Sequence, residues 1–178
     1  MSCLPNTPIA ANILSDPSAL GWSDLGSGLI TTSLSRYYPI VAALVTVRAM
    51  TTTNQHAIIR QVDFEETAAT SGDIKKHPLL VYVLGAGAGT SPSSGAVYNP
   101  DTTYLLGQFE VPAADYKRTT DTKWTASIKP NLYIRQTTAA SAQNLLLAIV
   151  SDSASSVSYA TGAAGRVRLF VEQATALS

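Results

Sequence analysis

The residues that could do chemistry in this sequence are a glycine-rich segment, two histidines and a small group of carboxylates. The segment Gly85-Ala86-Gly87-Ala88-Gly89 follows an apolar run, and a glycine-rich turn after a strand can cradle a phosphate group. A nucleotide site also needs the N-terminus of a helix, whose free N–H groups and dipole bind the anion. The chain instead continues Thr90-Ser91-Pro92-Ser93-Ser94-Gly95, and no Lys-Ser or Lys-Thr pair completes a P-loop. We therefore predict a surface loop here.

The two histidines are His56 and His77. A zinc site needs three or four His, Cys or carboxylate ligands in a defined geometry, and neither histidine has a second ligand at motif spacing. No Gly-x-Ser-x-Gly nucleophile elbow supports a Ser-His-Asp triad. We expect both histidines to be polar residues at strand entrances, and we expect no catalytic site, no metal site and no cofactor.

The carboxylates cluster at Asp63, Glu65 and Glu66. On a strand, Asp63 and Glu65 share one face, so two carboxylates together could bind a hard cation. The simpler interpretation is a solvated strand face that runs into a turn, and we favour it.

The elements that position these residues are strands. Alternation of apolar and polar residues or continuous apolar runs predict them, with no amphipathic helix between them. The expected segments are 41–48, 56–65, 79–84, 104–111, 123–128, 132–136, 145–150 and 166–172. About eight strands at regular spacing without crossover helices predict an all-β fold, an antiparallel β-sandwich of jelly-roll type.

The alternation also predicts which residues face the core. We expect Ile58, Val62 and Phe64 to share one face, and Leu105, Phe109 and Val111 to share another across Gly107. The two unbroken apolar runs, 79–84 and 145–150, indicate strands that are buried on both sides.

The first 35 residues contain no Lys or Arg, and the first basic residue is Arg36. Their prolines, serines and scattered apolar residues predict an extended N-terminal arm over residues 1–35, followed by the sandwich over residues 36–178. An arm of this composition suits a protein surface rather than a phosphate backbone. We expect it to bind a partner through five apolar anchors, and we expect the domain to fold without it. These anchors are Leu4, Ile9, Ile13, Leu14 and Trp22.

Composition excludes several classes of protein. Charged residues make up 13% of the chain and hydrophobic residues 46%, which argues against disorder and indicates a surface partly covered by partners. Twelve basic residues balance twelve acidic ones without a basic stripe, so we expect no nucleic-acid binding. The longest apolar runs are six residues, so we expect no membrane span. The single cysteine, Cys3, and the missing signal-peptide pattern fit synthesis in a reducing cytoplasm.

The stretch from Pro78 to Gln173 resembles the capsid decoration (cement) proteins of tailed bacteriophages. The residues that carry the resemblance are Pro78–Val83, Leu106–Tyr116, Asn131–Arg135, Leu145–Val150 and Arg166–Gln173. The resemblance implies a small β-sandwich, often trimeric, on the outer surface of the head. It also implies an N-terminal segment that reaches across neighbouring major capsid subunits.

These observations together predict a non-enzymatic virion structural protein that clamps neighbouring subunits of the major capsid protein. We expect it to be made in the host cytoplasm, to form homotrimers and to lie on the outside of the capsid. Two alternatives remain. One is a carbohydrate-binding jelly-roll module of a tail fibre, which would use exposed Tyr or Trp side chains. The other is a structural subunit of the tail or of the head–tail connector.

Overall fold

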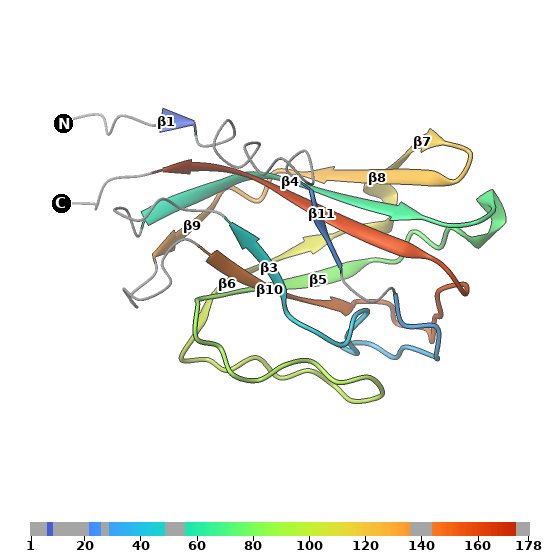
Figure 1. Ribbon diagram of the computed structural model, residues 1–178, viewed down its shortest axis with the longest axis horizontal. Coiled ribbons are helices and arrows are strands. Elements are labelled where there is room, and N and C mark those ends of the chain that lie inside the picture. The colour runs from blue at the N-terminus through green and yellow to red at the C-terminus, as the bar shows by residue number, and fades with distance from the viewer. Residues whose placement is uncertain (1–6, 9–21, 26–28, 49–55, 136–143, 174–178) are drawn as a thin grey trace.

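The computed structural model of the chain shows two antiparallel sheets packed face to face (Figure 1). It describes residues 7–8, 22–25, 29–48, 56–135 and 144–173. The strands are β1 (Thr7–Pro8), β2 (Ser23–Asp24), β3 (Val45–Arg48), β4 (His56–Thr67), β5 (Leu79–Leu84), β6 (Leu105–Val111), β7 (Tyr116–Thr120), β8 (Lys123–Ile128), β9 (Leu132–Arg135), β10 (Asn144–Ser151) and β11 (Ala164–Gln173). Two short 3₁₀ turns, η1 (Ser71–Asp73) and η2 (Ala113–Asp115), are the helical elements of the described residues. The predicted all-β antiparallel sandwich is confirmed.

The larger sheet has the order β1-β11-β4-β8-β7, with β2 also paired to β11 and β9 to β4. The smaller sheet has the order β3-β10-β5-β6. The chain crosses between the sheets at β2–β3, β3–β4, β4–β5, β6–β7, β9–β10 and β10–β11, so neighbouring strands are often distant in sequence. None of the described helical turns is long and apolar enough to cross a membrane.

The core lies between the sheets. Phe64 and Leu169 of the larger sheet and Val83 and Leu147 of the smaller sheet are at most 1% exposed and belong to one apolar cluster. The smaller sheet is also covered on its outer side, where Leu80, Leu84, Ala148 and Val150 pack with Tyr98 in a second cluster. The long β5–β6 loop supplies Tyr98 and runs along that side (Figure 1). The prediction that the two apolar runs are buried on both sides is confirmed.

Bulges change the faces predicted for two strands. In the β11–β4 pair, Phe170 lies opposite Gln61 and Val171 opposite Ile59, so Arg60 has no partner residue on β11. The side chains that reach the core therefore change from odd to even positions along β4. The prediction for Ile58 was wrong, because Ile59 and not Ile58 joins Val62 and Phe64 in the core.

The same effect occurs on β6. Gly107 lies opposite Val83 and Leu105 opposite Leu84, so Leu106 is the extra residue. Leu105 consequently packs with the outer cluster, whereas Phe109 and Val111 face the core. The prediction that these three residues share one face was wrong for Leu105.

Residues before Arg36 contribute to the folded domain. Leu25, Leu29 and Leu34 are at most 6% exposed and belong to the main core cluster. The backbone N–H of Leu34 donates to the carbonyl oxygen of Val157 at 2.6 Å, and that of Leu25 donates to Gly165 at 3.0 Å. Removing residues 1–35 would take these three leucines out of the core, so we now expect that truncation to destabilise the domain, in contrast to the prediction that the domain folds without this segment.

The strand predicted over 41–48 is shorter than expected. It begins at Val45, and bends occupy the preceding residues. The residues just before it already pair with β10, because Tyr38 accepts from the N–H of Ser151 and Ile40 donates to the carbonyl oxygen of Ile149.

Candidate functional site

The outer face of the larger sheet carries a ladder of ion pairs between β4 and β11. Arg168 Nη2 lies 2.6 Å from Asp63 Oδ2, and Arg166 Nη2 lies 2.6 Å from Glu65 Oε1. Each pair joins residues directly opposite one another in the register. Lys123 Nζ adds a contact to Glu65 at 3.5 Å.

The expectation of a solvated acidic face was wrong. Asp63 and Glu65 are 3% and 5% exposed, because the arginine side chains lie over them. Asp63 Oδ1 also accepts hydrogen bonds from Ser127 Oγ and Gln61 Nε2 at 2.7 and 2.8 Å. Carboxylates neutralised in this way do not offer a cation site, and the described residues contain no group of three or more metal-ligating side chains.

Trp22 covers the ladder. Its ring lies 4.6 Å from the guanidinium carbon of Arg168 and 5.3 Å from that of Arg166, within the range of cation–π contacts. Strand β2 holds it there, because Ser23 and Asp24 pair with β11 directly after the tryptophan. Trp22, predicted as a partner anchor, is thus half-buried on its own domain. The other predicted anchors, Leu4, Ile9, Ile13 and Leu14, lie outside the described residues.

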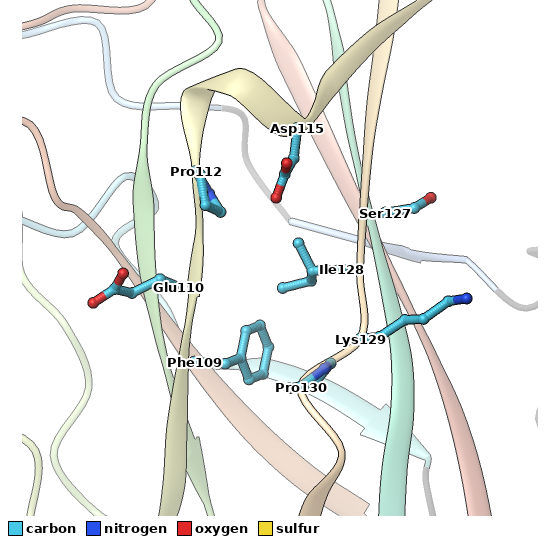
Figure 2. Close-up of a pocket in the computed structure, with 8 residues that line it drawn as sticks. All are labelled: Phe109, Glu110, Pro112, Asp115, Ser127, Ile128, Lys129 and Pro130. Carbon is cyan, nitrogen blue, oxygen red and sulfur yellow. The ribbon is translucent and has the colours of Figure 1, made fainter.

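A second surface feature is a shallow hollow of about 490 Å³ between the end of β6 and the β8–β9 connection. Figure 2 shows Phe109, Ile128 and two prolines, Pro112 and Pro130, around it, with the carboxylate of Asp115 pointing inward. Glu110, Ser127 and Lys129 also line it but point away from its centre (Figure 2). The hollow is thus a largely apolar surface with one inward carboxylate, that of Asp115.

A cluster of buried titratable groups occupies one end of the sandwich. Glu66, at the end of β4, is 0% exposed, and its two oxygens accept the backbone N–H groups of Lys75 and Lys76 at 2.7 and 2.9 Å. Burial raises the pKa of Glu66, and these two hydrogen bonds act against that rise. The carboxylate pins the loop before β5 against the end of β4.

His77, Tyr116 and Tyr159 complete this cluster. The rings of His77 and Tyr159 meet edge to face with centroids 4.8 Å apart. Burial, followed by the nearby charge of Lys75, lowers the pKa of His77 to about 4, so the ring is neutral at pH 7. Burial likewise raises the pKa of both tyrosines well above 10. His77 does precede β5 as predicted, but it is 6% exposed and enclosed rather than a surface residue.

The glycine-rich segment after β5 is a loop, as predicted. It makes a turn at Gly87, whose φ of +109° suits glycine, and no helix follows before β6. A Cβ at Gly87 would lie 3.2 Å from the ring of Tyr104, so this glycine serves close packing.

Sequence reasoning missed the ion-pair ladder and the tryptophan that covers it. Their signal was present as two acidic residues and two basic residues, each spaced by two, on separate predicted strands. The missing information was which strands are neighbours.

Comparison with known proteins identifies no family for the chain. No protein-family model matches the sequence, and no curated protein matches it. Among solved structures, the chain is similar to a chain of Desmodium yellow mottle tymovirus, with a TM-score of 0.27 and 11% sequence identity over 100% of this chain and 91% of that chain. A likeness at this level carries no argument about function, so the functional assignment rests on the chain's own residues.

Proposed function

We propose that this chain is a non-enzymatic structural protein of a tailed-phage virion, which decorates the outside of the capsid and clamps neighbouring major capsid subunits. The observation that carries the proposal is the way the N-terminal segment meets the domain. Both β1 and β2 add to β11 as short antiparallel strands. Strand addition is a general mode of peptide recognition, and the same mode would let this segment pair with a neighbouring subunit.

The distribution of apolar residues supports this division of labour. Among the described residues, the large hydrophobic side chain that is exposed is Val97, at 49%. Apart from the shallow hollow beside β6, the described surface of the sandwich therefore offers few large apolar side chains to a partner. We predict that such a contact uses apolar residues of the N-terminal segment, with Leu4, Ile9, Ile13 and Leu14 as anchors.

The energetics of such an arm favour a multivalent assembly. Burying one of these side chains contributes roughly 1.5–3 kcal/mol, whereas ordering the backbone costs about 1–2 kcal/mol per residue. A single arm therefore binds weakly, and a trimer that presents three arms to the lattice gains strongly in avidity.

The carbohydrate-binding alternative receives less support. Sugar sites of lectin type need an aromatic face that is free to stack on the ligand. The ring centroid of Trp22 lies 4.6 Å from the guanidinium carbon of Arg168, and that of Trp124 lies 4.5 Å from Lys76 Nζ. Both tryptophans of the chain are therefore engaged by cations of the chain itself.

A truncation tests the proposal, and the structure fixes where to cut. Removing residues 1–21 keeps Trp22, β2 and the core leucines, whereas removing 1–35 does not. We expect the 1–21 deletion to keep the unfolding temperature within a few degrees and to lose at least tenfold in affinity for phage heads stripped of the protein. Val97→Ser, which changes the exposed hydrophobic residue of the domain, is the control and should bind as the wild type does. Undiminished binding by the truncated chain would refute the role of the segment.

A further inference from the structure

We infer that the buried polar cluster at the end of the sandwich binds an internal water molecule that bridges Tyr116, Tyr159 and Glu66. Among the described residues, three fully buried side-chain atoms make no hydrogen bond to the protein. They are Tyr116 Oη, Tyr159 Oη and His77 Nε2. A buried polar group without a partner is costly, so the hydroxyls of Tyr116 and Tyr159, both near the carboxylate of Glu66, call for a bridging group.

The three atoms belong to side chains that face a common interior. Glu66 lies two residues beyond Phe64 on β4 and therefore points to the same, inner side of the sheet. Phe64 and Tyr116 lie opposite Ala126 from the two sides of β8, and their rings meet edge to face at 6.0 Å. Tyr116 thus stands beside the row that contains Glu66.

Tyr159 and His77 close the interior from the other side. Their rings are in edge-to-face contact, and Tyr159 sits between two backbone anchors, the Val157–Leu34 bridge and the turn at Ala163. The carboxylate of Glu66 contributes to raising the pKa of both tyrosines, and Tyr159 contributes to that of Tyr116, so the three groups lie within electrostatic reach of one another. They are nevertheless not joined by a direct hydrogen bond.

The donor and acceptor inventory fits water. Glu66 is an acceptor, and each tyrosine hydroxyl can donate and accept. His77 makes a hydrogen bond to the backbone of Ser158 that favours the protonated ring, so the ring nitrogen in this bond is the donor. In the neutral ring the other nitrogen, Nε2, is then an acceptor. A water molecule supplies two donors and two acceptor sites and typically bonds to about three buried groups. The negative charge of the Glu66 carboxylate disfavours an anion at this position.

Such a water would join β4, β7 and the loop before β11 into one unit. The test is a double-mutant cycle with Tyr116→Phe and Tyr159→Phe, read by urea unfolding. We expect each single variant to lower the folding equilibrium constant roughly fivefold to tenfold, and the double variant to lower it by clearly less than the product. Tyr98→Phe, which removes a hydroxyl of the outer cluster that donates to the backbone carbonyl of Thr90, should show no coupling to either.

Unchanged or increased folding constants for both single variants would overturn the inference, because they would mean that the hydroxyls have no partner to lose. Crystallography of the wild-type chain at high resolution gives a readout that needs no variant. Density for one water within about 3.2 Å of both hydroxyls supports the inference. Direct bonds among the tyrosines and Glu66 with no density between them, or a metal ion at that position, would overturn it.

Discussion

Leu25→Ala and Gly165→Ala together test whether the chain before Arg36 is part of the folded domain. Leu25 is 2% exposed and packs over Gly165 of β11. A Cβ placed on Gly165 would lie 2.6 Å from Leu25 Cδ1 and 3.2 Å from Leu29 Cδ2. The absence of a side chain at residue 165 is therefore what lets the N-terminal segment approach β11.

The magnitudes follow from packing. Leu25→Ala removes a buried side chain and should lower the free energy of unfolding by about 2–4 kcal/mol. Gly165→Ala forces Leu25 to move and should cost about 1–3 kcal/mol. In the double variant the shortened residue 25 leaves room for the new methyl group, so its loss should be smaller than the sum by at least about 1 kcal/mol.

Urea denaturation followed by tryptophan fluorescence and circular dichroism measures all four proteins of this cycle. Ala42→Gly, at an exposed position, is a control for a small local change. A loss below about 0.5 kcal/mol for Leu25→Ala, or strict additivity in the cycle, would refute the packing of this segment on β11.

Two further predictions concern charged groups. Arg168→Met should lower the free energy of unfolding by about 1–3 kcal/mol, because Asp63 is left buried with neutral donors alone. The control Arg118→Met breaks an exposed pair with Asp121 and should cost about 0.5 kcal/mol or less. Equal losses in urea unfolding would contradict the buried role of the ladder. The pKa of His77 is lowered to about 4, so between pH 6.5 and pH 4 the unfolded chain binds more protons at this residue than the folded one. The free energy of unfolding of the wild type should therefore fall as the pH falls through this window. The drop should exceed that of His77→Phe by up to about 3 kcal/mol. Both proteins retain Glu66, whose raised pKa acts in the opposite direction, and parallel pH profiles would show that His77 is not the titrating group.

The sequence predicted most of the longer strands because their signal is local, but it predicted no strand at β7 or at the short β1 and β2. The apolar runs in β5 and β10 and the alternation in β11 appear in the structure within one or two residues. The bulges at Arg60 and Leu106 could not be read in the same way, because an extra residue is defined only against the partner strand. Each bulge reversed the face of the residues beyond it, which is why Ile58 and Leu105 were misplaced.

The candidate site was less predictable because it depends on strand order. The period of two puts Arg166 with Arg168 on one face of their strand and Asp63 with Glu65 on one face of theirs, but no local pattern pairs β4 with β11. The pairing of β4 with β11 places one basic residue opposite one acidic residue in both ion pairs, and it buries the two carboxylates. The contact of Trp22 with Arg166 and Arg168 was unpredictable for the same reason, since these basic side chains come from the far end of the sequence.

The location of the chain in a particle tests the central proposal most directly. Cryo-electron microscopy of tailed-phage particles that carry the chain, with and without residues 1–21, would show where the sandwich is bound. We expect density for the sandwich on the outer surface of the head, arranged around lattice junctions, and loss of this density with the truncated chain. Density confined to the tail or the connector, or none on the particle, would contradict it.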